Sequence, residues 1–263
     1  MSKVTIRTLQ QRKIDGEKFA VLTAYDATQA HWVQAAGVEV ILVGDSLGNV
    51  VQGHTSTLPV TLSDMVYHTA AVHKAQGHSL LMSDVPFLGA ATPERALAAT
   101  ERLMQAGAEV VKLEGGGWLA ETVQLLARNG IPVCAHLGLT PQSVHKFGGY
   151  RVQGRDAAAA QLLADADTLV SAGADLLLVE CIPAALAAEL SQRSSVPVIG
   201  IGAGAQVDAQ VLVLYDMLGL NPHNAPRFVH NFMTSAGSPQ QAIANYRDAV
   251  LNGSFPAQEH TFS

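Results

Sequence analysis

Short runs of hydrophobic residues alternate with alanine-rich segments along this chain. Continuous Val/Ile/Leu runs are typical of parallel strands that helices cover on both faces. Strands that alternate with helical segments indicate a parallel β/α arrangement. The pattern predicts eight strands, each followed by a helix, at Phe19–Ala24, Val38–Val43, Ser79–Asp84, Val110–Glu114, Pro132–His136, Leu176–Glu180, Pro197–Ile201 and Val211–Tyr215.

The borders of the predicted helices carry local signals. Thr61 and Asp64 have the spacing of a capping box, and Thr92 and Thr140 each place a capping hydroxyl before a proline. Ala-Gly pairs stand just before several strands, where glycine suits the left-handed residue that closes a helix. These glycines are Gly37, Gly107 and Gly173.

Two parallel architectures compete for this pattern, a closed barrel and an open doubly wound sheet. The Rossmann sheet would show a glycine-rich fingerprint after its first strand, where this chain reads Thr23-Ala-Tyr-Asp26. No linker divides residues 1–263, and barrels of this length form one domain. We therefore expect a single (β/α)8 (TIM) barrel with extra C-terminal helices over Phe228–Met233 and Ser238–Leu251.

Composition excludes several classes of function. The net charge of −6 gives no basic footprint for nucleic acid, and no apolar stretch approaches the roughly 20 residues that span a bilayer. The first residues lack the apolar region of a signal peptide. Cys134 and Cys181 have no zinc-ligand spacing, although a disulfide stays open. We expect a cytoplasmic protein that binds neither nucleic acid nor membrane.

Four of the hydrophobic runs end in a carboxylate, at Asp45, Asp84, Glu114 and Glu180. The carboxyl ends of barrel strands form the active sites of this fold. Several acids gathered there repel one another unless a cation holds them, and oxygen donors suit Mg²⁺ or Mn²⁺. A single such acid could equally cap the next helix or form a loop salt bridge. Four together favour a metal site.

Lys112 lies inside a hydrophobic strand, where an unpaired ammonium would be costly. Alternate side chains of a strand share a face, so Lys112 points the same way as Glu114. Three roles stay open for Lys112: a structural ion pair with Glu114 or Asp84, a Schiff base, or a charge that clamps a carboxylate substrate.

The same alternation places Cys134 and His136 on one face of their strand. His136 could bind substrate or hydrogen-bond a loop. Cys181 should point away from Glu180, which predicts that Cys181 faces the helices if Glu180 enters the barrel mouth.

Several longer motifs occur in a specific order over nearly the whole chain. They are Thr23-Ala-Tyr-Asp26, Val43-Gly-Asp-Ser-Leu-Gly48, Gln52-Gly-His54, Thr57-Leu-Pro-Val60, Asp84-Val-Pro-Phe87, Val111-Lys-Leu-Glu-Gly115, His136-Leu-Gly-Leu-Thr-Pro-Gln142, Gly148-Gly-Tyr-Arg-Val-Gln-Gly-Arg155, Leu178-Val-Glu-Cys181 and Gly200-Ile-Gly-Ala-Gly204. In this order and spacing the chain resembles the ketopantoate hydroxymethyltransferase (3-methyl-2-oxobutanoate hydroxymethyltransferase) family.

This resemblance implies a (β/α)8 barrel, a divalent metal (usually Mg²⁺) and a homodecamer. It also implies transfer of a hydroxymethyl group from 5,10-methylenetetrahydrofolate to 3-methyl-2-oxobutanoate, an early step of pantothenate synthesis. Position by position, it assigns the metal to Asp45 and Asp84, with Glu114 in support, in part through water. It assigns keto-acid contacts to Asp45, Ser46, Asp84, Lys112 and, nearby, His136, and the general base to Glu180.

The chemistry of this reaction agrees with the assignment. The C3 proton of a 2-oxo acid is too weakly acidic for an unaided carboxylate. A metal chelated by the keto oxygen and carboxylate stabilises the enolate by several kcal/mol as a Lewis acid, so that Glu180 can remove the proton.

Two positions depart from the family pattern. The chain reads Asp208-Ala209-Gln210 where the family has Asp-Gly-Gln, and Tyr215-Asp216 where it has His-Asp. Both lie near the predicted eighth strand. Two rival functions stay open, an aldolase-type lyase that uses the same acids and a binding barrel without catalysis, because fold alone does not define function.

Overall fold

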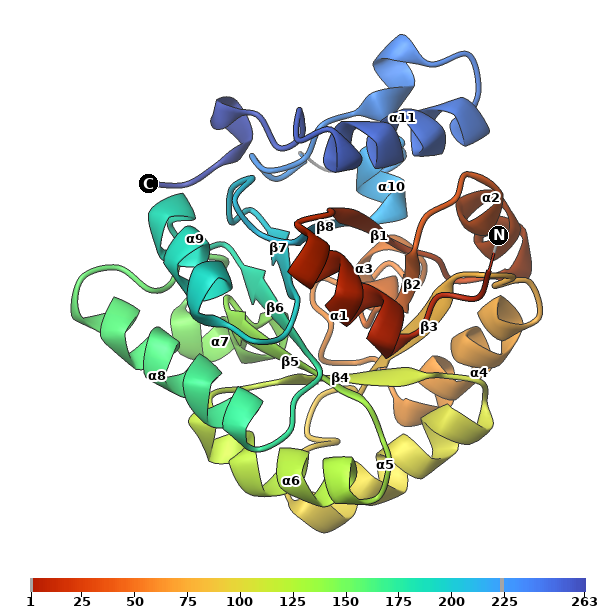
Figure 1. Ribbon diagram of the computed structural model, residues 1–263. Coiled ribbons are helices and arrows are strands. Elements are labelled where there is room, and N and C mark those ends of the chain that lie inside the picture. The colour runs from red at the N-terminus through yellow and green to blue at the C-terminus, as the bar shows by residue number, and fades with distance from the viewer. Residues whose placement is uncertain (1, 223–224) are drawn as a thin grey trace.

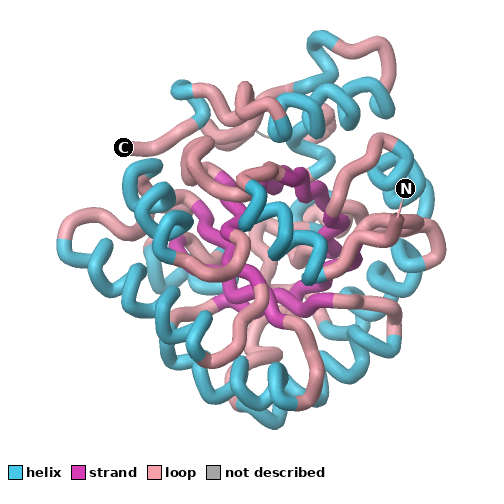
Figure 2. The backbone as a smooth tube through the Cα atoms, in the orientation of Figure 1, coloured by secondary structure: helices cyan, strands magenta, loops and turns pink. Residues whose placement is uncertain are grey.

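Eight parallel strands close into a barrel, in chain order around the ring. Their bounds agree with the predicted strands to within two residues for the first seven: β1 Phe19–Thr23, β2 Val40–Val43, β3 Leu80–Asp84, β4 Val110–Glu114, β5 Val133–Gly138, β6 Leu176–Glu180, β7 Val198–Ile201 and β8 Ala209–Leu212. The computed structural model describes residues 2–222 and 225–263. Figure 2 shows the ring of strands inside a layer of helices. The predicted (β/α)8 barrel is confirmed.

The barrel interior is filled by alternate side chains of the strands. Phe19, Met82 and Val110, for example, belong to one buried cluster and are fully inaccessible to solvent. The helix α1 (Ile6–Asp15) lies across the end of the barrel at which the strands begin (Figure 1), and its Leu9 joins the same cluster. One end of the barrel is therefore closed, which leaves the carboxyl ends of the strands for a site.

The outer layer consists of helices that follow the strands. They are α2 Ala27–Ala35, α3 Leu47–Val50, α4 Leu62–His73, α5 Pro93–Gln105, α6 Ala120–Arg128, α7 Val144–Phe147, α8 Ala157–Ser171, α9 Ala184–Arg193, α10 Leu214–Met217 and α11 Pro239–Leu251, with short 3-10 turns at Gly117–Leu119, Pro141–Ser143, Phe232–Ser235 and Gln258–His260. Among these described helices, none is long and apolar enough to cross a membrane.

The predicted helix borders are mostly confirmed. Thr61 and Asp64 form the capping box of α4, and Thr92 caps α5 ahead of Pro93. Thr140 makes no side-chain capping bond, because Pro141 begins only a short 3-10 turn. The glycines that precede strands have the expected left-handed backbone, with φ of 86° at Gly37, 111° at Gly107 and 109° at Gly173.

The prediction that every strand is followed by a helix is wrong between β7 and β8. These strands are joined by a tight connection over residues 202–208, which is too short and glycine-rich for a helix. The C-terminal helix α11 packs on the neighbouring seam between β8 and β1. The Tyr246 hydroxyl of α11, fully buried, lies 2.9 Å from the carbonyl oxygens of Val21 in β1 and Gln210 in β8.

The predicted eighth strand is placed too late in the sequence. The strand begins at Ala209, which pairs with Phe19, and ends at Leu212. Tyr215 therefore lies in α10, because the Leu214 N–H donates to Thr23 Oγ1 and the chain turns there. Alanine and glutamine are not typical of a strand, so the start of β8 at Ala209 and Gln210 was not predicted. In the structure Ala209 fills the barrel interior, and Gln210 Nε2 donates to Gly204 O.

The predicted C-terminal helices are half confirmed. Helix α11 occupies Pro239–Leu251, as expected, with Ser238 as its cap. The helix expected over Phe228–Met233 is wrong, since only a 3-10 turn forms, at Phe232–Ser235. Its aromatic residues pack individually instead, Phe232 against Tyr246 with ring centroids 5.5 Å apart.

We predict that Tyr246→Phe destabilises the protein by about 1–3 kcal/mol, because it removes the hydroxyl that serves two buried carbonyls at the β1–β8 seam. Urea unfolding followed by circular dichroism measures the loss. Tyr67→Phe is the control, since Tyr67 is 71% exposed. Equal stability of the two variants would contradict this role of Tyr246.

Candidate active site

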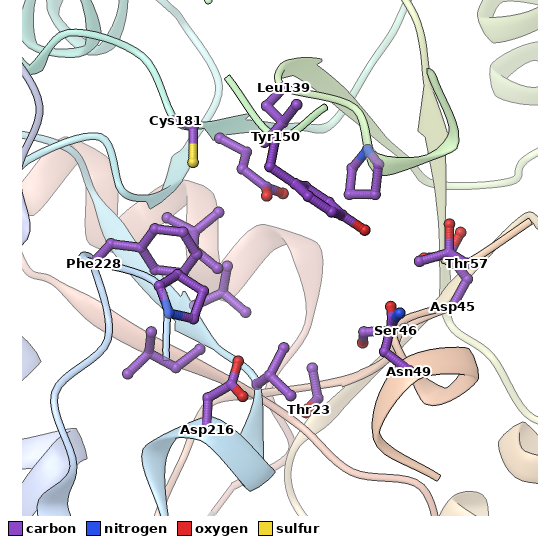
Figure 3. A pocket seen from close by; sticks show the side chains of 18 of the residues that line it. Thr23, Asp45, Ser46, Asn49, Thr57, Leu139, Tyr150, Cys181, Asp216 and Phe228 are labelled. Carbon is purple, nitrogen blue, oxygen red and sulfur yellow. The ribbon is translucent and has the colours of Figure 1, made fainter. Parts of the chain in front are cut away.

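A cavity of about 580 Å³ opens at the carboxyl ends of the strands. Every site residue predicted from the sequence lines it: Asp45, Ser46, Asp84, Lys112, Glu114, His136 and Glu180. Figure 3 shows Asp45, Ser46 and Thr57 on one side of this cavity, and Cys181, Phe228 and Asp216 on the other. The structure therefore brings together side chains that are far apart in the sequence.

Strand register explains why these polar side chains meet. Asp84 pairs with Lys112 across β3 and β4, and Glu114 pairs with His136 across β4 and β5. Each follows buried interior residues at a spacing of two, so all of them point into the barrel mouth. The predicted shared face of Lys112 and Glu114 is confirmed.

Lys112 lies at the centre of the group, with its side chain 5% exposed. Its ammonium is 3.0 Å from Asp84 Oδ1, 3.5 Å from Glu114 Oε1 and 3.2 Å from His136 Nδ1. Burial alone would lower the pKa of Lys112, but the charges of Asp84 and Glu114 outweigh burial and raise it. The amine therefore stays protonated, which disfavours a Schiff base and fits a charge clamp.

His136 links two carboxylates on β5. Its Nδ1 is 3.2 Å from Glu114 Oε1, and its Nε2 is 3.4 Å from Glu180 Oε2. Burial and the Lys112 charge act to lower the pKa of His136, but the contacts with Glu114 and Glu180 raise it overall. An imidazolium at this position would stabilise both neighbouring acids.

Asp45 and Asp84 are neighbouring buried carboxylates. The Asp45 N–H donates to Asp84 Oδ2 at 3.0 Å, and this hydrogen bond holds the Asp84 carboxylate beside Asp45. Burial raises the pKa of Asp45 well above its usual range, and the charges of Asp84 and Glu114 raise it further. Burial likewise raises the pKa of Asp84, although Lys112 opposes it. Lys112 therefore supplies positive charge to Asp84 but leaves Asp45 without an ion pair among the described residues.

Glu114 is the most strongly held of the acids. Its Oε2 accepts from the Gln142 N–H at 3.0 Å, in addition to its contacts with Lys112 and His136. Burial would raise the pKa of Glu114, but Lys112 and His136 lower it to about 2. The carboxylate is thus ionised and committed to protein partners.

The fit of a metal ion can be judged from the acids themselves. Over the described part of the chain, no group of three or more His, Cys, Asp or Glu side chains is arranged to hold a metal. The Asp45–Asp84 pair nevertheless suits Mg²⁺, which proteins commonly bind through one or two carboxylates, waters and substrate oxygens. Asp84 Oδ1 contacts the Lys112 ammonium at 3.0 Å, whereas the buried Asp45 carboxylate has no ion pair with a lysine or arginine of the described residues, as expected of an acid that binds a metal ion.

Glu180 stands apart from the Asp45–Asp84 pair. It ends β6, lines the cavity, and contacts His136 but no lysine or arginine of the described residues. Its side chain is 14% exposed, more than those of Lys112 and Glu114. A carboxylate that is open to the cavity and has no ion pair with a lysine or arginine of the described residues can receive a proton from a bound molecule.

Ser46 is positioned by an aromatic residue of the first motif. The hydroxyls of Ser46 and the buried Tyr25 are 2.9 Å apart. Tyr215, one of the two positions that differ from the family pattern, packs on Tyr25 with ring centroids 5.9 Å apart. The Gln29 side chain donates a hydrogen bond to the Tyr215 hydroxyl. Tyr215, which stands where the family has histidine, therefore contacts Tyr25, the side chain that positions Ser46.

Sequence reasoning missed the role of Gln142. Its side-chain amide donates to Asp45 Oδ2 at 2.8 Å and to Val85 O at 3.0 Å. It lies in the quoted motif His136-Leu-Gly-Leu-Thr-Pro-Gln142, but an amide in a loop gives no sign of its contact. Tyr150 and Asp216 also line the cavity, and the sequence did not predict them as site residues either.

The expectation that Cys181 faces the helices is wrong. Glu180 enters the mouth as expected, yet Cys181 also lines the cavity, and its sulfur is visible there in Figure 3. Strand alternation ends at Glu180, because Cys181 has a left-handed backbone with φ of 48°. Both cysteines are free thiols, so the open question of a disulfide is resolved.

The chain is similar to known proteins over nearly its whole length. Residues 3–258 match the sequence profile of ketopantoate hydroxymethyltransferase. A 3-methyl-2-oxobutanoate hydroxymethyltransferase from Alcanivorax borkumensis is 58% identical over 98% of this chain and 99% of that protein. A second, from Hahella chejuensis, is 55% identical over 99% of each. The solved structure of phosphonopyruvate hydrolase shares the fold, with a TM-score of 0.63 and 14% identity over 98% of this chain and 93% of that one.

We predict that Lys112→Met destabilises the protein by about 3–5 kcal/mol at neutral pH, because it leaves Asp84 and Glu114 buried without their cation. Chemical unfolding measures the effect, with Lys74→Met, an exposed lysine at the end of α4, as control. A loss no larger than that of the control would show that Lys112 does not hold the acids.

Proposed function

The chain belongs to the ketopantoate hydroxymethyltransferase family, and on that premise we propose that it transfers a hydroxymethyl group from 5,10-methylenetetrahydrofolate to 3-methyl-2-oxobutanoate. The products are 2-dehydropantoate (ketopantoate) and tetrahydrofolate. One observation carries the proposal: Glu180 opens to the same cavity as the buried Asp45, and neither carboxylate has an ion pair with a lysine or arginine of the described residues.

The keto acid would bind at the Asp45 side of the cavity. Lys112 offers a fixed positive charge for an oxyanion or carboxylate, and Ser46, held by Tyr25, offers a hydroxyl. Asp45 and Asp84 would hold a divalent cation, Mg²⁺ by family resemblance, with Glu114 supporting it indirectly. When bound, such a cation supplies Lewis-acid polarisation of the keto oxygen.

Glu180 is the proposed general base. Its carboxylate would take the proton from C3 of the keto acid, and the electron pair left on C3 would delocalise onto the keto oxygen as an enolate. Lys112, which lines the same cavity, would stabilise that negative charge. Water would open the methylene bridge of the folate donor, so that both of its C–N bonds break and tetrahydrofolate and formaldehyde form in the cavity. The enolate carbon would then attack the formaldehyde carbon, and the formaldehyde oxygen would take back the proton from Glu180 to become the new hydroxyl group. His136, in contact with Glu180, would stabilise the Glu180 carboxylate before it accepts the proton.

The family resemblance also supports a biological setting. We propose that the protein acts in the cytoplasm as a homodecamer, in the route to pantothenate and coenzyme A. Light scattering of the purified chain tests the assembly directly, and a monomer would contradict that part of the proposal.

We predict that Glu180→Gln retains binding of 3-methyl-2-oxobutanoate but slows exchange of its C3 proton with solvent by about 10²–10⁴-fold, because the amide cannot accept the proton. Nuclear magnetic resonance in deuterated water measures the exchange without any folate. Glu189→Gln, whose side chain is 55% exposed on α9, is the control. Undiminished exchange in Glu180→Gln would remove Glu180 from this role.

A further inference from the structure

The cavity is larger than a small branched keto acid requires. Its volume of about 580 Å³ lies within the range of roughly 300–1,000 Å³ that is typical of pockets for drug-sized ligands. Away from Asp45, the lining comes from the ends of β7 and β8 and from the C-terminal segment. This second part of the cavity is lined by Ile201, Val211, Asp216, Pro226, Phe228 and Phe262.

Asp216 is the acid of this second part. It is 8% exposed, and its Oδ1 accepts from Asn221 Nδ2 at 2.7 Å. Its other oxygen has no hydrogen bond, and its carboxylate has no ion pair, to any described residue. Burial raises the pKa of Asp216, which reflects a carboxylate short of donors. In Figure 3 its side chain lies beside the cavity, across from Asp45.

Two aromatic rings line the same cavity as Asp216. Phe228 and Phe262 both lean on the connection after β7, since a side chain at Gly202 would come within 3.0 Å of each ring. The Arg227 guanidinium lies 5.8 Å from the centre of the Phe262 ring. A buried carboxylate beside flat apolar surfaces suits a planar ring with donors on one edge.

We propose that Asp216 anchors the pterin ring of the folate donor, and this inference rests on the proposed function. A pterin presents a ring N–H and an exocyclic amino group side by side, a fork that matches a carboxylate as a guanidinium does. The ring packs against Phe228 and its neighbours, and the methylene-bearing nitrogens extend toward Asp45 and Glu180 in the same cavity. Asn221 holds the carboxylate in place.

The test compares tetrahydrofolate binding by wild type, Asp216→Asn and the control Asp248→Asn, whose side chain is 71% exposed on α11. Calorimetry should show affinity about 10–100-fold weaker for Asp216→Asn, because the amide replaces a charged acceptor pair by a neutral acceptor and a donor. The control should bind like wild type. Equal affinity of Asp216→Asn and wild type would overturn the inference.

A second readout is decided by the wild-type protein. Pterin and lumazine differ in that lumazine has a carbonyl where pterin has the amino group. Wild type should bind pterin more tightly than lumazine in a fluorescence titration, and Asp216→Asn should lose that preference. Equal affinity of wild type for both rings would overturn the inference even if the variant fails to fold. Proton exchange in the keto acid requires no pterin, so its absence in wild type would instead count against the proposed function.

Discussion

The buried ammonium of Lys112 is the interaction on which the site depends. Four carboxylates lie at or just beyond the ends of separate strands around the barrel mouth, and their charges would repel one another without a positive charge between them. Lys112 contacts Asp84, Glu114 and His136 within 3.5 Å, and this holds Glu114 ionised. Its charge does not satisfy Asp45, whose pKa stays raised by burial and by the neighbouring acids. The remaining deficit of positive charge lies where the proposed metal would bind.

The barrel supplies the geometry that makes this cluster possible. Parallel pairing places Asp84 beside Lys112 and Glu114 beside His136, so the order of charges follows from register. Helix α1 closes the opposite end of the barrel, and α11 fastens β8 to β1 through Tyr246. The site therefore rests on strand ends, while the loops and the C-terminal segment supply the second, more apolar half of the cavity.

Much of this arrangement follows from the sequence, because buried strands and their terminal acids leave a strong pattern. The shared face of Lys112 and Glu114 needed only strand alternation, and that rule failed at Cys181 because its left-handed backbone ends the alternation. The start of β8 at Ala209 and the missing helix after β7 depend on tertiary packing that local residue types do not signal. The pattern also could not divide the acids by role: the separation of Glu180 from the proposed metal ligands came from family resemblance.

The central claim is that one cavity combines a metal site at Asp45 and Asp84 with a general base, Glu180, and that both act on the same keto acid. Its most direct test is formation of ketopantoate by the purified protein from 3-methyl-2-oxobutanoate and 5,10-methylenetetrahydrofolate, with Mg²⁺ or with EDTA. The account predicts turnover that requires both substrates, stops with EDTA and returns when Mg²⁺ is restored. Turnover that is undiminished in EDTA would contradict the metal site, and absence of ketopantoate under all conditions would contradict the function.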